Sequence, residues 1–210
     1  MNTQTHLLLG LAVFARRPRE SGAPSSSAAL EAALLFGALV PDASLFLMWG
    51  QARLAGVPDE RIWSELYYSG FWQGIGALSN SLLVFALLAL AARSLGGRFV
   101  GEAVRVHRAA SIVLAFAAAA LLHVVTDLPL HHDDGHPHFW PFSDWIYASP
   151  VSYWDPEHHG RTWSTIESLL ALGLSVVLWR RYRAWPARAA LLLAGLSYVA
   201  VGLYWTLQFG

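Results

Sequence analysis

The 210-residue sequence contains no cysteine and no lysine, and only 13% of its residues are charged. The absence of cysteine excludes a disulfide-stapled secreted domain, thiolate zinc sites, iron–sulfur clusters and thiol catalysis. Any metal site must therefore use histidine, aspartate or glutamate as ligands. Fourteen arginines balance fourteen acidic residues, so no basic field indicates a nucleic-acid partner.

The sequence also contains long apolar blocks, and hydrophobic residues make up 55% of the chain. Soluble domains carry about 25% charged residues, so this composition favours a multi-pass membrane protein. We expect an all-α fold, a single transmembrane helical bundle over residues 1–210, with one short N-terminal span at Thr5–Ala15. The five full spans expected are Ala28–Gly50, Phe71–Arg93, Ala109–Leu130, Trp163–Trp179 and Ala189–Leu207.

Two connections carry patterns of their own. Segment Pro58–Tyr68 places apolar residues along one side of a helix, which predicts a short helix lying in the membrane interface; these residues are Ile62, Trp63, Leu66 and Tyr67. The 131–160 connection holds six of the nine histidines together with five acidic residues and many aromatic residues. Loops of this length are usually functional.

Arginine positions predict the orientation of the bundle. Eleven of the fourteen arginines lie in alternate connections, namely those after the first, third and fifth spans; they are Arg16, Arg17, Arg19, Arg93, Arg98, Arg105, Arg108, Arg180, Arg181, Arg183 and Arg188. By the positive-inside rule, these connections face the cytoplasm. The sequence therefore predicts a bacterial-type inner-membrane protein with both termini and the 131–160 loop on the outer, periplasmic side.

Ionisable and strongly polar residues within spans are costly and mark functional sites. Six positions qualify, and all six fall in the outer halves of their spans under the predicted orientation; they are His6, Asp42, Asn80, His123, Asp127 and Glu167. His123 and Asp127 share one helical face because they are four residues apart, and His131 extends the same stripe. Imidazole and carboxylate ligands suit zinc, manganese or iron.

Structural roles remain open for each residue taken alone. The His123–Asp127 pair is also consistent with helix packing, and Asp42 with capping of a helix broken at Pro41. Asn80 and Ser81 are typical of interhelical hydrogen bonding. Glu167 lies near a helix start, where a carboxylate favours the helix dipole. The joint pattern of His6, Asp42, His123 and Asp127 is harder to explain in this way.

At these residues the sequence resembles the membrane-bound metal-dependent hydrolase family, the group that includes the LexA-regulated inner-membrane hydrolase-like proteins. The motifs occur in order, namely Thr5-His6-Leu7-Leu8, Pro41-Asp42, Ser79-Asn80-Ser81, His123-x3-Asp127 and Trp140-Pro141-Phe142-Ser143. The resemblance implies a zinc-type hydrolase. Two positions depart from the family pattern, because Asn80 replaces a histidine and Ser44 replaces an acidic residue.

A second resemblance runs through His123, Asp127 and His131, with Pro129-Leu130 between them. This segment is similar to the His-x3-Asp…Pro-Leu-His segment of zinc-dependent phospholipase C and single-strand nucleases. It implies metal-assisted cleavage of a phosphodiester.

The main hypothesis is an outer-leaflet hydrolase that cleaves an ester or phosphodiester of a lipid-like substrate. His6, Asp42, His123 and Asp127 would bind a divalent ion, zinc first and manganese or iron as alternatives. The residues expected to complete the shell are His131, His132, Asp134 or His138. Asp127 and Asp134 are expected to act in catalysis. The expected substrate-binding residues are Asn80, Ser81 and Trp140.

Two other hypotheses belong to different classes. A non-catalytic accessory subunit would use the polar cluster for packing and the 131–160 loop to dock a protein partner. A transporter would use the carboxylates and histidines as a proton or metal path, but no polar residues continue into the inner halves of the spans.

Overall fold

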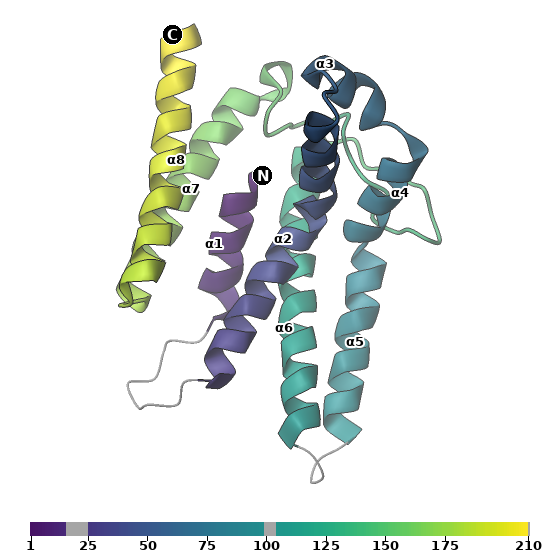
Figure 1. Ribbon diagram of the computed structural model, residues 1–210, viewed down its shortest axis with the longest axis vertical. Helices are drawn as coiled ribbons and strands as arrows, with labels where there is room; N and C mark the ends of the chain where they lie inside the picture. The colour runs from purple at the N-terminus through teal and green to yellow at the C-terminus, as the bar shows by residue number, and fades with distance from the viewer. Residues whose placement is uncertain (16–24, 99–103, 210) are drawn as a thin grey trace.

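The computed structural model describes residues 1–15, 25–98 and 104–209, and its regular elements in these ranges are all helical (Figure 1). The all-α prediction is therefore confirmed. The long helices are α2 (Ser25–Leu54), α5 (Leu82–Arg98), α6 (Val104–Asp127), α7 (Gly160–Arg181) and α8 (Trp185–Phe209). The short elements are α1 (Thr3–Phe14), α3 (Asp59–Arg61), η1 (Ile62–Leu66), α4 (Gly70–Ser79), η2 (Leu128–Leu130) and η3 (Pro156–His158).

Four helical segments of the described part are long and apolar enough to cross a membrane, namely Ala28–Leu54, Gly70–Gly96, Val106–Leu130 and Gly160–Arg181. They match the first four full spans predicted, and α1 matches the short one. The fifth predicted span is helical in α8, but its side chains at 201–202 and 204–207 lie outside the described residues. The side chains of other residues used for the predicted orientation lie outside them too, namely Arg16, Arg17, Arg19, Arg98 and Arg105.

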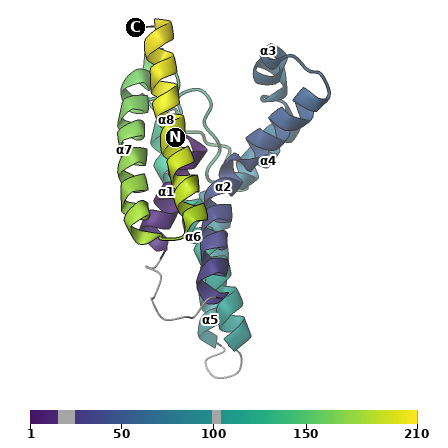
Figure 2. The same ribbon diagram turned by 60° about the vertical axis from the view of Figure 1, so that its left-hand side comes forward.

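The helices form two groups joined by α1. α6 packs against α2 and α5, whereas α7 packs against α8, and α1 contacts α2, α6 and α7 (Figures 1 and 2). The N-terminus, α3 and the 131–160 loop lie toward one end of the bundle. The C-terminal ends of α1 and α5 lie toward the other end. The predicted polar positions are thereby gathered toward one end.

Small residues allow α2 and α6 to approach closely. A Cβ atom added at Gly37 would lie 2.1 Å from the backbone oxygen of Phe116, so only glycine fits. Ala38 and Ala119 are buried in the same contact. Membrane helices often pack through small residues. Lipid tails are as apolar as the helix surfaces, so the hydrophobic effect does not drive the helices together and close van der Waals packing holds them instead.

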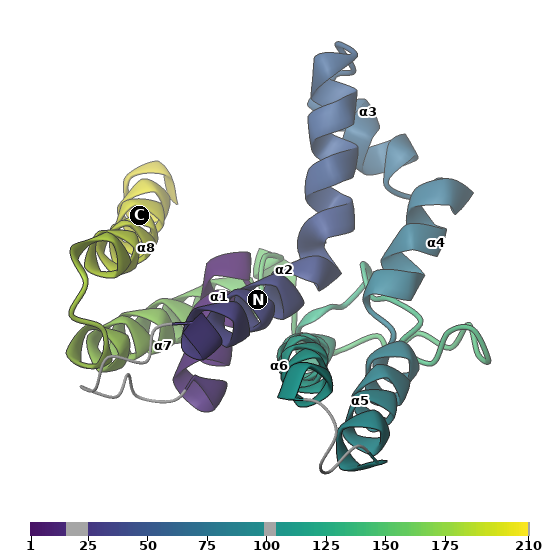
Figure 3. The same ribbon diagram turned by 60° about the horizontal axis from the view of Figure 1, so that its bottom comes forward.

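Helix α2 bends at Pro41, and its outer part leans away from α7 and α8 together with α3, η1 and α4 (Figures 2 and 3). Proline removes one helical hydrogen bond and crowds the preceding turn, so a bend is expected there. The helix predicted over Pro58–Tyr68 is present as α3 and η1, and its location in the membrane interface stays a prediction. Ile62 is fully buried against Met48 of α2, whereas Trp63 is 43% exposed.

The chain is interrupted between α4 and α5, and the 131–160 loop fills the break. The backbone N–H of Leu82 donates to the carbonyl oxygen of His138 at 2.9 Å. The Ser81 hydroxyl donates to the carbonyl oxygen of Trp140 at 2.6 Å, and His138 Nδ1 bonds to the Asn80 carbonyl oxygen at 2.9 Å. The backbone groups freed by the interruption are thus satisfied inside an apolar bundle, as they must be.

Helix α1 is only 12 residues long, and α7 satisfies both of its ends. At the N-terminal end Glu167 Oε1 accepts hydrogen bonds from the Asn2 N–H at 2.6 Å and the Thr5 hydroxyl at 2.7 Å. At the C-terminal end the Arg181 guanidinium donates to the carbonyl oxygens of Leu11, Ala12 and Ala15 at 2.9–3.1 Å. Each charge is opposite in sign to the dipole end that it contacts.

Substitution of Gly37 should separate α2 from α6. For Gly37→Ala we expect the free energy of unfolding to fall by about 1–3 kcal/mol, because the new Cβ overlaps a backbone oxygen that cannot move aside cheaply. The matched control is Gly50→Ala in the same helix, where nothing lies within 4 Å of the new atom. Equilibrium unfolding in mixed micelles, followed by circular dichroism, measures both. Equal stability of the two variants would contradict the assigned contact.

Loss of the Glu167 carboxylate should loosen α1. We expect Glu167→Ala to lower the free energy of unfolding by about 2 kcal/mol, because it leaves buried donors on α1 without an acceptor. Glu167→Gln keeps one oxygen acceptor and should cost less. Glu60→Ala, on the exposed α3, serves as control and should lie within about 0.5 kcal/mol of the parent. The same unfolding assay decides, and a Glu167→Ala variant as stable as the control would refute this role.

Candidate metal centre

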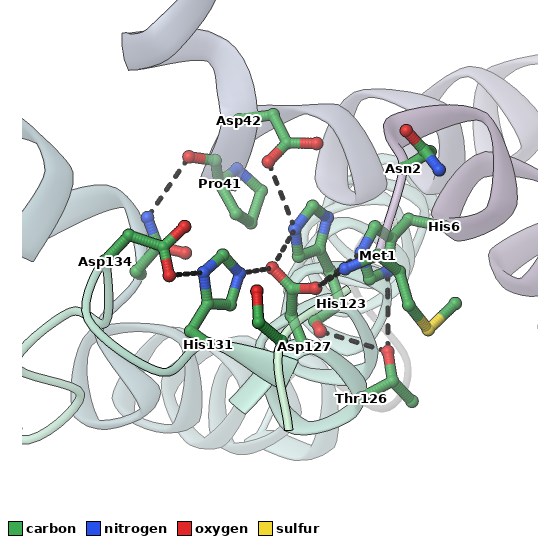
Figure 4. Close-up of polar contacts among 12 residues, drawn as sticks. Met1, Asn2, His6, Pro41, Asp42, His123, Thr126, Asp127, His131 and Asp134 are labelled. Carbon is green, nitrogen blue, oxygen red and sulfur yellow. Dashed lines mark hydrogen bonds and ion pairs between the residues drawn. The ribbon is translucent and has the colours of Figure 1, made fainter. Parts of the chain in front are cut away.

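Three helices bring four polar side chains together at the predicted position (Figure 4). α1 supplies His6, α2 supplies Asp42, and α6 supplies His123 and Asp127. His6 Nε2 lies 3.4 Å from Asp127 Oδ1, and His123 Nε2 lies 3.5 Å from Asp42 Oδ1 and 3.9 Å from Asp127 Oδ2. His6 and His123 are almost completely buried.

The hydrogen bonds at Nδ1 of both rings indicate which nitrogen carries the proton. His123 Nδ1 lies 2.7 Å from the Ala38 carbonyl oxygen, which can only accept, so Nδ1 is the donor. Thr126 donates its hydroxyl to the Leu122 carbonyl oxygen at 2.8 Å and therefore accepts from His6 Nδ1 at 3.4 Å. With Nδ1 as the donor, each ring directs its Nε2 atom toward the carboxylates.

The Nε2 atoms of His6 and His123 have no hydrogen-bond partner among the described residues. A lone pair that faces a carboxylate oxygen is repulsive unless a proton or a cation lies between them. The two rings are stacked with centroids 3.5 Å apart, so protonation of both would place two positive charges in contact. One cation shared by both nitrogens removes this conflict.

The spacing also fits one ion. Two ligands that are each about 2.1 Å from a tetrahedral ion lie about 3.4 Å apart. His6, His123 and Asp127 each offer one ligand atom, and these atoms all lie within 4.8 Å of one another. Proteins usually orient a ligating histidine through a hydrogen bond from its other ring nitrogen, as His123 Nδ1 makes to the Ala38 carbonyl oxygen.

A chain of charged groups leads outward from this cluster. His131 Nε2 lies 2.7 Å from Asp127 Oδ2, and its Nδ1 lies 2.8 Å from Asp134 Oδ1. Burial opposes protonation of His131, but the bonds to both carboxylates outweigh it and raise its pKa to about 9. Burial likewise opposes charge on Asp134, whose pKa is nevertheless lowered by His131. The Met1 amino group contacts Asp127 as well.

A cavity of about 400 Å³ adjoins the cluster between the outer part of α2, α4 and the 131–160 loop. Asp42, Asp127, His131 and Asp134 all reach it, and its remaining wall is rich in tyrosine and tryptophan. His136 also lines it, and burial lowers the pKa of His136 to about 4, so this ring is neutral at pH 7. Gly76 leaves room for His136, whose ring would lie 3.2 Å from an added Cβ.

The predicted substrate residues occupy different places. Asn80 lines the cavity, but its amide donates to the carbonyl oxygens of Pro41 at 3.2 Å and Gly76 at 3.1 Å. Ser81 and Trp140 bond to each other at the α4–α5 break and are not among the described residues that line the cavity.

Two histidines predicted as ligands also lie elsewhere. His138 braces the α4–α5 break through Asn80, as described above, and burial lowers its pKa. The backbone of His131 is extended, so His132 points to the opposite side. There its Nδ1 bonds to the Ser149 carbonyl oxygen at 2.6 Å, and its ring stacks on His158 at 3.6 Å.

Sequence reasoning did not select several cavity residues, among them His136 and Tyr153. The 131–160 loop has no helical or strand period between His131 and Asp155, so no spacing rule could place its side chains. The only available signal was the density of histidine, which does not separate His136 from His132. Glu167 has a structural role, but a different one from that considered: it lies beyond the first turn of α7, and its carboxylate bonds to the N-terminal end of α1.

Comparison with known proteins gives one match. The model of the family described as YdjM inner membrane protein matches residues 1–209. No curated protein and no solved structure matches the chain. The family supports a multi-pass protein of the inner membrane with a lipid environment around its apolar helices. Because the match covers almost the whole sequence, the chain belongs to the YdjM inner membrane protein family.

Proposed function

We propose that this protein is a metal-dependent hydrolase that acts at the outer leaflet of the inner membrane. The observation that carries the proposal is the pair of buried Nε2 atoms on His6 and His123, which face carboxylates at the spacing of ligands on one ion. The preferred ion is zinc, with manganese or iron as alternatives, because all donors are imidazole or carboxylate.

The residues fit distinct tasks. His6, His123 and Asp127 would hold the ion, and Asp42 would add a second carboxylate. When bound, the ion supplies Lewis acidity that activates water and polarises a carbonyl or phosphoryl oxygen. Asp134 lies on the cavity wall beyond His131, where its carboxylate can accept a proton from attacking water. His131 fixes Asp127 and Asp134 by bonding to both.

The position of the centre favours an amphiphilic substrate. Asp42, His123 and Asp127 lie within helices long enough to span the membrane, while the adjoining cavity reaches the 131–160 loop. A group bound there lies near the boundary between lipid and water. An ester or phosphodiester of a lipid meets this requirement, and the arginine distribution supports a periplasmic location for the cavity and both termini.

Removal of the ligating histidines should abolish metal binding. In detergent-purified parent protein we expect about one zinc, manganese or iron per chain by mass spectrometry, because three ligands converge on one point. His6→Ala and His123→Ala should each lower the metal content at least tenfold and abolish lipid hydrolysis. His107→Ala, on an exposed part of α6, is the matched control and should retain the parent's metal content.

Two results would contradict the proposal. Metal retained in both ligand variants would show that the ion binds elsewhere. A parent protein that is folded, supplied with zinc and still free of metal would remove the basis of the hydrolase assignment. Circular dichroism on the same samples separates loss of the site from loss of the fold.

An accessory-subunit role is the second candidate, and exposed apolar side chains on the 131–160 loop favour it. Phe142 is 82% exposed, Trp145 52% and Ile146 47%. Exposed apolar patches of this kind occur at protein interfaces. A stoichiometric partner that co-purifies with the parent and is lost on Phe142→Ser with Trp145→Ser would support this role. Unchanged solitary protein in both preparations would count against it.

A further inference from the structure

Six aromatic side chains line the cavity beside the metal centre, and we call them the aromatic wall. They come from η1 and the turn after it, from α4 and from the 131–160 loop; they are Trp63, Tyr67, Tyr68, Trp72, Tyr153 and Trp154. The rings of Tyr67 and Tyr68 meet edge to face at 4.9 Å, and Trp63 lies 6.4 Å from Tyr67. Aromatic faces are therefore presented from several directions.

Part of the aromatic wall is open. Trp63 is 43% exposed, Tyr68 55% and Trp154 50%, although all three line a cavity. Large aromatic side chains left uncovered next to a cluster of buried polar groups are typical of a binding site.

Acidic groups lie against these rings. The Trp154 indole N–H donates to Asp134 Oδ2 at 3.0 Å, and the Tyr67 hydroxyl donates to the Asp134 carbonyl oxygen at 3.1 Å. Burial and the negative charge of the adjacent aspartates raise the pKa of Tyr67 and Tyr68, with Asp133 and Asp134 acting on both. The wall therefore lies beside negatively charged aspartates, of which Asp134 also pairs with the protonated His131.

The described residues that line the cavity include Asp42, Asp127 and Asp134 but no arginine, and the sequence has no lysine. Proteins that bind a phosphate without a metal use arginine or lysine for it. An aromatic surface beside carboxylates has the opposite preference, since ring faces and carboxylates both attract an alkylammonium group. The two ends of the cavity thus suit opposite charges, an anionic group at the metal centre and a cationic group at the aromatic wall.

We propose that the substrate is an alkylammonium phosphate ester, as carried by a zwitterionic glycerophospholipid, with its ammonium group against the aromatic wall and its phosphate at the metal centre. This proposal rests on the proposed function for the phosphate end. Its ammonium end rests on the exposed rings of the aromatic wall and on the lack of arginine in the described lining. The proposal therefore predicts that the site distinguishes lipids by whether their headgroup carries an ammonium group.

The test compares two lipids that differ only in the headgroup. The full-length protein, loaded with zinc, is titrated with dioleoyl phosphatidylethanolamine or dioleoyl phosphatidylglycerol, and bound lipid is counted by native mass spectrometry. We expect phosphatidylethanolamine to bind about fivefold more tightly than phosphatidylglycerol, or better. One partly exposed cation–π contact can produce a ratio of this size. A parallel arm titrates soluble phosphoethanolamine and follows it by ligand-observed NMR.

Variants of the aromatic wall carry the second part of the test. Trp63→Ala and Trp154→Ala should each reduce the preference for phosphatidylethanolamine several-fold. Trp145→Ala is the matched control, since Trp145 lies in the same loop as Trp154, is 52% exposed and does not line the cavity. It should keep the parent's preference. Because the substituted tryptophans are partly exposed, the variants should fold, which circular dichroism verifies.

Each result has one meaning. A preference for phosphatidylethanolamine that depends on the aromatic wall supports the proposal with a lipid as the source of the group. Wall-dependent binding of phosphoethanolamine alone supports the same recognition with a soluble ester as the source. Equal binding of both lipids, unaffected by Trp63→Ala and Trp154→Ala, overturns it.

Turnover of the same lipids separates this proposal from the proposed function. If phosphatidylethanolamine binds selectively and neither lipid is cleaved, the hydrolase assignment fails while the headgroup recognition stands. If both lipids are cleaved at equal rates and bind equally, the hydrolase assignment stands while the headgroup recognition fails.

Discussion

The position of the metal centre depends on how a helix too short to span a bilayer is held in the bundle. At 12 residues, α1 would leave unpaired N–H groups at one end and unpaired carbonyl groups at the other. Glu167 and Arg181, both on α7, satisfy the two ends with charges that complement the helix dipole. Because His6 lies in the second turn of α1, the same contacts fix the depth of its ring against α6.

Irregular backbone is concentrated beside the cavity. α2 bends at Pro41, the α4–α5 helix is broken at Asn80, and η1 is a π-helical turn. Such features are tolerated at membrane depth where they line a cavity or find other hydrogen bonds. Asn80 shows how, because its amide bonds to the carbonyl oxygens of Pro41 and Gly76. Asn80, where the sequence departs from the hydrolase pattern that it resembles, therefore joins the two distorted helices.

Hydropathy and helical spacing were sufficient for the helices and for the centre of the site. Burial of apolar blocks fixes α2, α4–α5, α6 and α7, and the four-residue spacing places His123, Asp127 and His131 on one stripe. The convergence of His6 and Asp42 on that stripe followed from the depth of each residue in its span. The loop could not be predicted in the same way. His132, expected to complete the ligand shell, points away from the cavity because the extended backbone of His131 turns successive side chains to opposite sides, and His136, for which no role was expected, lines the cavity.

The charges of the centre explain why it needs a cation. Asp42 and Asp127 face the Nε2 atoms of His123 and His6, whose Nδ1 atoms already donate to Ala38 and Thr126. His131, protonated at neutral pH, is shared between Asp127 and Asp134, and the Met1 amino group also contacts Asp127. Among the ion pairs of the described residues, Asp42 has only His123 as a partner, and a carboxylate without a compensating cation at this depth is costly. The same excess of negative charge that destabilises the centre on its own favours tight binding of a divalent ion, so stability and metal affinity are coupled through Asp42 and Asp127.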